Sequence, residues 1–210
     1  MIRLFIADDH PVVRAGLTLV VADEGDIKVV GELATGVGLI DALRNTPTDV
    51  LLLDVSMPGP GIIPLLENLR EAHPTIGVLV LSVHPEEQYA TRALRAGARG
   101  YLTKDHSTSE LVMAVRKVHG GGRYVSATLA ERLAAELSGD ANGLPHERLS
   151  DREFEVLCLL GSGRSVTEIA GVLSLSVKTV STYRVRLLEK LPAVSNAELV
   201  RYVVAHGLMR

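Results

Sequence analysis

Polar side chains close four short apolar runs in the first half of the chain. The acidic pair Asp8-Asp9 follows the first run, and Asp54, Ser82 and Lys104 end the next three. Carboxylates that lie close together repel one another unless a hard cation binds them, and Mg²⁺ prefers oxygen ligands and retains several waters. If they converge in the folded protein, three carboxylates, a hydroxyl and an ammonium are suited to phosphoryl chemistry.

The runs that carry these residues alternate with helix-like segments, which predicts a doubly wound α/β fold with a five-stranded parallel sheet. The carboxyl ends of parallel strands meet at one edge of the sheet, where functional groups collect. The third strand is a continuous apolar run, as expected when helices cover both sheet faces. The expected strands are Ile2–Ala7, Ile27–Leu33, Val50–Asp54, Val78–Ser82 and Gly100–Leu102, and the expected helices are Val12–Ala22, Gly38–Asn45, Ile63–Ala72, Glu86–Ala96 and Ser107–His119.

A change in composition separates this α/β part from a small all-α part. Three glycines, 120–122, end the fifth helix, and Ser126–Leu137 resumes a helical period. The segment Gly139–Pro145 (GDANGLP) then has the composition of a linker. We therefore divide the chain into a first domain over residues 1–121, a linker with a helix over 122–146 and a second domain over 147–210.

The second domain has clear helix start signals. Three serines each precede a glutamate by three residues, namely Ser150, Ser165 and Ser195. This spacing fits the capping box, in which the two side chains bond to free backbone N–H groups. Helices are expected over Val166–Leu173 and Val177–Leu191, and only three residues join them. So short a connection predicts a helix-turn-helix.

Composition and charge narrow the class of protein. With 210 residues and 47% hydrophobic composition, the chain can form one or two packed cores. No apolar run is long enough for a signal peptide or a membrane span, so we expect a cytoplasmic protein with no membrane partner. The single cysteine, Cys158, cannot form an internal disulfide, which suits a reducing compartment, and we expect it to be buried in a helix.

The charge is distributed unevenly along the chain. Residues 150–210 hold eight Lys/Arg and six Asp/Glu, a net charge of +2, whereas the remainder holds 14 and 19, a net charge of −5. A mildly basic C-terminal part behind an acidic N-terminal part favours nucleic-acid binding by the former.

Two sets of motifs, each in order, resemble a known family. Four segments of this chain resemble a bacterial receiver domain, namely ADDHPVVRAG, LLLDVSMPG, LVLS and AGARGYLTKD. Three further segments resemble a LuxR-type helix-turn-helix, namely LSDREFEVLCLL, VTEIAGVLSLSVKTVSTYRVRLLEKL and NAELVRYVVAHGL. Together they cover nearly the whole chain, which is identified as a member of the response regulators of the NarL/FixJ class. The resemblance implies a strand order of 2-1-3-4-5, with the site between the first and third strands.

The resemblance implies a transcriptional regulator switched by phosphorylation, and not an enzyme. Asp54 matches the phosphoacceptor, which takes a phosphoryl group from a sensor histidine kinase. Lys104 matches the lysine that pairs with a phosphoryl oxygen, and Ser82 and Tyr101 match the residues that switch on phosphorylation. The magnesium ligands implied by the resemblance are Asp8, Asp9, Asp54 and the backbone carbonyl of Ser56.

The helix Val177–Leu191 resembles a recognition helix, which makes double-stranded promoter DNA the expected partner. Its basic side chains are suited to phosphates, and its small side chains to base edges and thymine methyl groups. The expected DNA contacts are Lys178, Thr179, Ser181, Thr182, Arg184, Val185 and Arg186. A homodimer is expected on DNA, and RNA polymerase is a further candidate partner. Leu199 and Val203, together with Val200, could form a self-association stripe or belong to the core, and the sequence leaves both open.

Several positions depart from the pattern of the family. Pro60-Gly61-Ile62 and Pro64 could change the loop beside Asp54, and Val83 stands where many receivers have Ala or Gly, which could change the phosphoryl lifetime. On the DNA side, Tyr183 stands where His is common, and Val166 where Asn is common. These departures affect the details of the sites, since the acidic constellation is complete.

Two rival functions share part of this chemistry. An atypical regulator of the same fold would bind DNA without phosphorylation. A haloacid-dehalogenase-like phosphatase also uses an Asp nucleophile and Mg²⁺, but such enzymes carry a second Asp two residues later, where this chain has Ser56. His10 and His84 are expected to be loop residues and not metal ligands.

Overall fold

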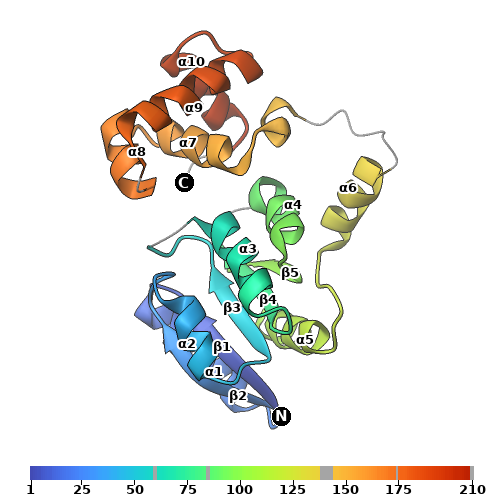
Figure 1. The fold of residues 1–210 in the computed structure, drawn as a ribbon. Coiled ribbons are helices and arrows are strands. Elements are labelled where there is room, and N and C mark those ends of the chain that lie inside the picture. Colours follow the sequence, from blue (N-terminus) through green and yellow to red (C-terminus); the bar gives the residue numbers. More distant parts are fainter. Residues whose placement is uncertain (59–60, 84–85, 138–143, 174, 209–210) are drawn as a thin grey trace. The chain divides into compact units, whose positions relative to one another are not determined.

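The computed structural model describes residues 1–58, 61–83, 86–137, 144–173 and 175–208. The chain divides into two compact units, Met1–Leu133 and Ala134–Arg210. The first unit is α/β and the second contains only helices among its described residues, which confirms the predicted fold class (Figure 1). No helix in these ranges is long and apolar enough to cross a membrane.

The first unit is built on five parallel strands in the order β2-β1-β3-β4-β5, as the resemblance implied. The order reverses between β1 and β3, and in sheets of this kind ligands bind beyond the carboxyl ends of the strands at that point. The strands are β1 Ile2–Ala7, β2 Ile27–Leu33, β3 Val50–Asp54, β4 Gly77–Ser82 and β5 Gly100–Thr103.

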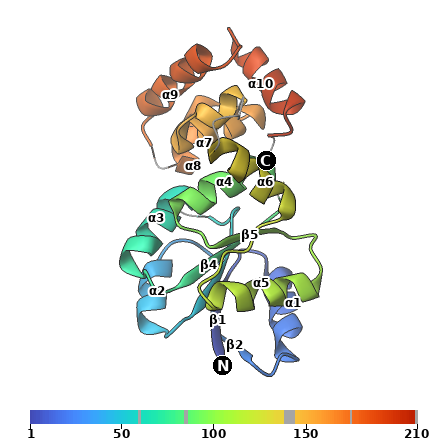
Figure 2. The same ribbon diagram turned by 90° about the vertical axis from the view of Figure 1, so that its right-hand side faces the viewer.

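Helices cover both faces of this sheet. Figure 2 shows α1 and α5 on one side of the strands, with α2 and α3 on the other side. Leu52 and Leu79 lie in one buried cluster with Val115 and Val118 of α5. All of β3 is buried, as its continuous apolar run predicts. The helices are α1 Pro11–Ala22, α2 Leu39–Asn45, α3 Ile62–Ala72, α4 Glu86–Ala96 and α5 Thr108–His119.

The helices α1 to α5 begin and end within one residue of the predicted bounds. Local sequence signals account for these helix ends. Pro64 is the third residue of α3, where its missing N–H would in any case have no partner within the helix. Pro60 lies outside the described residues. Helix α5 begins with a full capping box between Ser107 and Glu110, which the sequence analysis did not use.

The segment after α5 runs along the edge strand β5. Gly100 and Tyr124 form a parallel bridge, and the Tyr101 N–H donates to the Tyr124 carbonyl at 3.2 Å. Gly100 permits this approach, because a Cβ there would lie 2.8 Å from the Tyr124 carbonyl oxygen. The chain therefore covers its own edge strand before it enters helix α6, Ala127–Leu137.

The second unit packs its helices around α7. Helix α7 contacts α8, α9 and α10, and α8 contacts α9. A Cβ on Gly161 would lie 2.3 Å from Val203, so glycine allows the close approach of α7 and α10. Cys158 is fully buried in α7, as predicted. The elements are a 3₁₀ turn at Pro145–Arg148 and helices α7 Asp151–Gly161, α8 Val166–Leu173, α9 Val177–Lys190 and α10 Asn196–Ala205.

The predicted caps form at all three serines, with one difference. Ser150 and Ser165 each make the reciprocal pair of bonds with the glutamate three residues later. Ser195 accepts from the Glu198 N–H, but the Glu198 carboxylate accepts from the N–H of Val194 and not from that of Ser195. The start of α10 is therefore satisfied by half of a capping box and a bond to the preceding residue.

A partly buried ion pair links α9 to α7. Glu153 is only 1% exposed, and its two oxygens accept from the Lys190 ammonium at 2.7 and 2.9 Å. Burial raises the pKa of the Glu153 carboxyl, but the bonds from Lys190 and Ser150 outweigh this effect and hold the pKa below its ordinary value. The charge pair is therefore kept at neutral pH, and it links α7 to α9.

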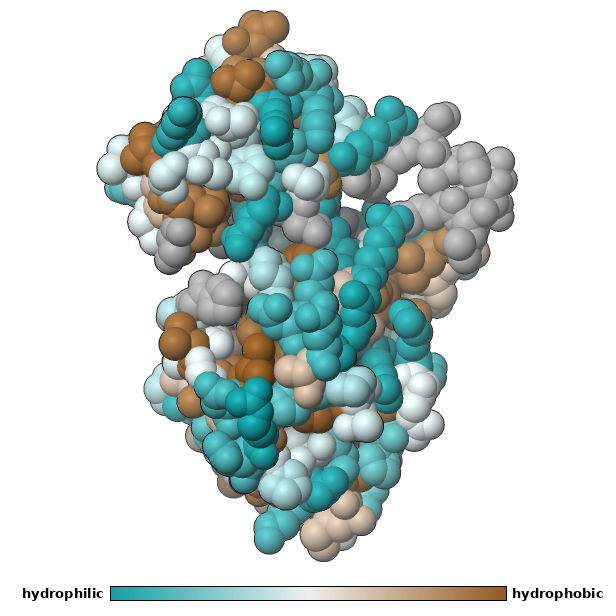
Figure 3. All heavy atoms as spheres, viewed as in Figure 1, coloured by the Kyte–Doolittle hydropathy of each residue, from teal (hydrophilic) through white to brown (hydrophobic). Residues whose placement is uncertain are grey.

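Most of the surface in the view of Figure 3 is hydrophilic, and apolar side chains occupy small areas of it. Two exposed valines of the chain bear on function, because each lies beside a predicted site. Val83 is 66% exposed and follows Ser82, and Val185 is 51% exposed on α9. Single exposed valines are common on protein surfaces, so their exposure alone does not indicate a binding site.

Candidate functional site

The polar residues singled out in the sequence come together at one edge of the sheet. Asp54 and Ser82 are the last residues of β3 and β4, while Asp8 and Lys104 directly follow β1 and β5. Because the strands are parallel, all four residues reach the same edge. They are separated by up to 96 positions in the sequence, and the sheet alone brings them into contact.

Lys104 lies between two buried carboxylates. Its Nζ is 2.6 Å from Asp8 Oδ2 and 3.0 Å from Asp54 Oδ1. Asp8 and Asp54 are 1% and 2% exposed, so water screens neither charge effectively. One ammonium therefore offsets two buried negative charges, and the site keeps an excess of negative charge.

The pKa shifts follow from this imbalance. Burial raises the pKa of the Asp54 carboxyl above its ordinary value, and the charges of Asp8 and Asp9 add to the rise against the opposing effect of Lys104. Burial lowers the pKa of Lys104, but its bonds to Asp8 and Asp54 outweigh this effect, so the pKa lies above its ordinary value. Lys104 therefore stays charged, and an added cation would stabilise the Asp54 carboxylate.

The acidic cluster fits a divalent cation. One ligand atom from each of Asp8, Asp9, His10 and Asp54 lies within 4.8 Å of the others. Asp54 Oδ2 is buried and accepts no hydrogen bond from any described residue. A buried carboxylate oxygen without a donor is costly, and a hard cation with oxygen preference would satisfy it. The donor set is therefore suited to Mg²⁺. Ser56, whose carbonyl was expected to contribute, lies in the turn two residues after Asp54.

The two expected switch residues are buried in β4 and β5. Ser82 and Tyr101 are both fully buried. The backbone N–H of Lys104 donates to the Ser82 carbonyl at 2.7 Å, which ties the end of β4 to the loop after β5. Tyr101 packs inside the unit, and its backbone N–H is bonded to Tyr124 in the segment that leads to α6.

The structure brings one residue to the cluster that the sequence analysis left in a loop. His10 Nδ1 is 2.8 Å from Asp9 Oδ1 and 3.4 Å from Asp8 Oδ1. The N-cap position of α1 belongs to His10, and the Asp8 carboxylate accepts from the His10 N–H at 2.8 Å. Its position directly after the acidic pair was the available signal. His84 lies outside the described residues.

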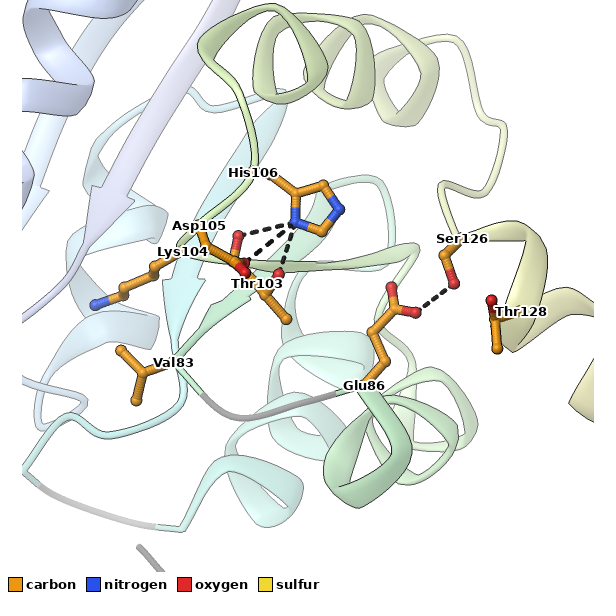
Figure 4. A pocket seen from close by; sticks show the side chains of 8 residues that line it. All are labelled: Val83, Glu86, Thr103, Lys104, Asp105, His106, Ser126 and Thr128. Carbon is orange, nitrogen blue, oxygen red and sulfur yellow. Dashed lines mark hydrogen bonds and ion pairs between the residues drawn. The ribbon is translucent and has the colours of Figure 1, made fainter. Parts of the chain in front are cut away.

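A pocket of about 660 Å³ adjoins the cluster on the β5 side. Its lining includes Val83, Lys104, His106 and, from α4 and the start of α6, Glu86 and Ser126. Figure 4 shows the Glu86 carboxylate bonded to the Ser126 hydroxyl, while the Lys104 ammonium lies well away from His106. Val83, which is 66% exposed, therefore lines the same pocket as Lys104.

The predicted DNA-binding helix α9 has one exposed face. At 100° per residue, five of the seven expected contacts fall within an arc of about 120°. They are Lys178, Thr179, Thr182, Val185 and Arg186, and all are exposed except Thr179, which is half-buried. The opposite side is packed, since Val180 and Leu187 are fully buried. The helix therefore presents two cations, two hydroxyls and a methyl-bearing side chain together.

The other two expected contacts lie off this exposed face. Ser181 and Arg184 are half-buried, and the Nε of Arg184 is buried without a partner among the described residues. Arg184 lies about 100° beyond the edge of the arc, so it is not grouped with Lys178 and Arg186. The periodicity of the helix separates these arginines although they are only two residues apart.

Leu199 and Val203 of α10 belong to the core. Leu199 and Val203 are fully buried, and Val203 contacts the position of Gly161 on α7. Of the two alternatives that the sequence left open for them, the core is therefore correct.

Comparison with known proteins agrees with the two units. Residues 4–116 match the family described as response regulator receiver domain, and residues 147–203 match bacterial regulatory proteins of the luxR family. The chain is 39% identical over 210 residues to the response regulator GacA of Pseudomonas viridiflava, with 100% of this chain and 98% of GacA covered. It is 35% identical over 209 residues to the response regulator UvrY of Escherichia coli (strain K12), with 99% and 96% covered.

Solved structures of the response regulator RcsB are also similar. One from Salmonella typhimurium, described in terms of conformational dynamism for DNA interaction, is 29% identical with a TM-score of 0.77 and covers 98% of each chain. Another, from Salmonella enterica serovar Typhimurium, is bound to promoter rprA in the presence of the phosphomimetic BeF3⁻. It is 29% identical with a TM-score of 0.73, covering 98% of this chain and 100% of that one.

The parallel sheet, the acidic cluster at its carboxyl edge and the receiver match together define a response regulator, and the chain belongs to that family. Proteins of this family carry a receiver domain that a kinase phosphorylates. The luxR-type helix-turn-helix further assigns the chain to the NarL/FixJ class, in which the second domain binds DNA and regulates transcription.

Proposed function

We propose that Asp54 accepts a phosphoryl group from a sensor histidine kinase and that the resulting acyl phosphate raises the affinity of the second domain for promoter DNA. The observation that carries this proposal is the environment of Asp54. Its Oδ2 is buried without a hydrogen-bond donor among the described residues, and Lys104 Nζ lies 3.0 Å from its Oδ1. A carboxylate with one oxygen free and one beside a cation is suited to nucleophilic attack.

The transfer needs little from the protein beyond position and charge. An oxygen of Asp54 attacks the phosphorus of a phosphohistidine, the new O–P bond forms, and the P–N bond breaks as the kinase imidazole leaves. Lys104 then pairs with an oxygen of the transferred group. Asp8, Asp9, Asp54 and the carbonyl of Ser56 would hold Mg²⁺, which when bound neutralises charge on the phosphoryl oxygens.

The response to the new charge would begin at Ser82. Its hydroxyl is a donor for a phosphoryl oxygen, and movement toward the site would change the space beside Tyr101. Because the Tyr101 N–H is bonded to the Tyr124 carbonyl, a shift in β5 reaches the segment that precedes α6. Phosphorylation would thereby shift a pre-existing equilibrium between inactive and active arrangements.

In this proposal the domains keep the division drawn from the sequence. The receiver covers residues 1–121, a linker with a helix covers 122–146 and the DNA-binding domain covers 147–210. The chain would bind double-stranded promoter DNA as a homodimer through the exposed face of α9. It would contact RNA polymerase at the promoter. Both interactions require that the protein be located in the cytoplasm. The RcsB structure bound to a promoter supports the DNA partner. We assign no enzymatic turnover of an external substrate to the chain.

The proposal predicts that phosphate uptake depends on a divalent cation. Full-length protein incubated with acetyl phosphate and Mg²⁺ should gain one phosphoryl group, because the small donor replaces the phosphohistidine. Chelation with EDTA before the donor is added should abolish the gain, and excess Mg²⁺ should restore it. Intact-mass spectrometry measures both results.

Two outcomes would contradict the proposal in different ways. Phosphate uptake that persists in EDTA would exclude the cation role of the acidic cluster. No uptake under any condition, together with DNA binding by the same sample, would favour a regulator that acts without phosphorylation.

A further inference from the structure

The imidazole of His10 lies within reach of the acidic cluster and could supply a nitrogen ligand. A cation bound only through oxygen atoms would not use it. His10 Nδ1 lies 2.8 Å from Asp9 Oδ1 and 3.4 Å from Asp8 Oδ1. The His10 side chain is 62% exposed, so its imidazole can turn without disturbing the core. The Asp8 carboxylate accepts from the His10 N–H, which holds the backbone of His10 beside the cluster.

The spacing of these atoms matches the edges of a small coordination polyhedron. With metal–ligand bonds of about 2.1 Å, neighbouring ligand atoms lie about 3.0 Å apart in an octahedron and about 3.4 Å apart in a tetrahedron. The two nitrogen–oxygen distances from His10 span this range. One ligand atom from each of Asp8, Asp9, His10 and Asp54 lies within 4.8 Å of the others. Opposite vertices of such an octahedron are about 4.2 Å apart, so the most distant pair of atoms would need to approach by about 0.6 Å.

Proximity of acidic groups is not by itself a metal site, and Asp54 supplies the independent observation. This residue is 98% buried, and its Oδ2 has no hydrogen-bond donor among the described residues. A carboxylate oxygen that is buried, without a donor and within the same cluster points to a cation as its partner.

The ligand set then decides which cation binds most tightly. Magnesium takes oxygen ligands and keeps several waters, so it gains nothing from an imidazole. Imidazole suits ions such as Zn²⁺ and Ni²⁺, and affinity for nitrogen and oxygen sites rises along the divalent series toward them. We propose that His10, with Asp8, Asp9 and Asp54, forms a site for a divalent transition-metal ion of this borderline class, and that His10 Nδ1 is its nitrogen ligand.

This site deepens the proposed function, because it uses the carboxylates assigned there to Mg²⁺. An ion held by His10 excludes Mg²⁺ from the same oxygens, which include those of Asp54, the proposed nucleophile. Mg²⁺ and the transition-metal ion therefore compete for one site.

Direct ligation can be tested on the metal-free full-length chain without a histidine tag. Co²⁺ is the spectroscopic probe, because a proton on an imidazole that ligates Co²⁺ gives a strongly shifted, solvent-exchangeable proton NMR signal. Wild type should show one such signal from the Nε2–H of His10. The signal should be absent from His10→Gln and present in His106→Gln, whose imidazole lies in the loop after β5 but outside the cluster.

Calorimetric titration of the same three proteins separates this inference from the proposed function. Zn²⁺ should bind His10→Gln at least about tenfold more weakly than wild type, since even loss of an outer-shell partner costs about 10–100-fold. Mg²⁺ affinity should be the same in both. A His10→Gln variant that keeps both the shifted signal and the Zn²⁺ affinity would overturn the inference. Failure of wild type to bind Mg²⁺ would instead overturn the cation role in the proposed function.

Discussion

The Asp54→Asn variant is expected to take up no phosphate from acetyl phosphate in Mg²⁺, whereas wild type gains one phosphoryl group per chain. The amide nitrogen of Asn is not a nucleophile, and the amide also removes one of the oxygens available to the cation. The substitution keeps the size of the side chain and removes a buried negative charge, so the fold should tolerate it. Intact-mass spectrometry of both proteins measures the difference.

A matched control comes from the same end of the sheet. Asp105 directly follows Lys104, but its side chain is 87% exposed and it is not part of the acidic cluster. Asp105→Asn should therefore take up phosphate as wild type does. If Asp54→Asn still gained a phosphoryl group, a different carboxylate would be the acceptor, and the free Asp54 oxygen would need another explanation.

The second large effect is expected on α9, where different substitutions should change the overall affinity for DNA and the preference for one DNA sequence separately. Lys178→Ala should weaken binding equally on a selected target duplex and on an unrelated duplex. It should also reduce the slope of log K against log salt by about 1, because a phosphate contact releases counterions without reading bases. Thr182→Ala or Val185→Ala should lose about 1–3 kcal/mol of discrimination between the two duplexes, with little change in the salt slope.

Fluorescence anisotropy at several salt concentrations measures both quantities, once a target has been selected from a random library. Arg201→Ala is the control for charge, because Arg201 is 76% exposed on α10 and lies outside the α9 face. It should leave both the salt slope and the discrimination unchanged. Full discrimination by both the Thr182 and Val185 variants would show that the helix docks differently, and Tyr183 would be the first residue to examine.

The strands and helices were predictable from the sequence because each has its own local signal. The apolar runs of β3 and β4 predicted these two strands, and Asp54 and Ser82 marked where each of them ends. Serine–glutamate pairs marked the starts of α7 and α8. The partner of Glu198 was not predictable, because the choice between the N–H groups of Ser195 and Val194 depends on the path of the chain before the helix.

Contacts that depend on three-dimensional packing had to come from the structure. Lys104 bridges Asp8 and Asp54, a geometry that no spacing encodes, although the resemblance named all three residues. Tyr124 pairs with β5 because the edge strand lacks another neighbour, and the sequence around Tyr124 carries no strand signal. Arg184 was grouped with Lys178 by residue type, whereas its buried Nε follows from the side of α9 on which it lies.

The affinity of the full-length chain for DNA, with and without phosphorylation, tests the central claim most directly. With acetyl phosphate and Mg²⁺, wild type should bind the selected duplex about 5–150-fold more tightly, the range of coupling between two sites in a switchable protein. Asp54→Asn should show the same affinity with and without the donor. Wild type that is fully phosphorylated by mass yet binds the duplex no more tightly would contradict the account.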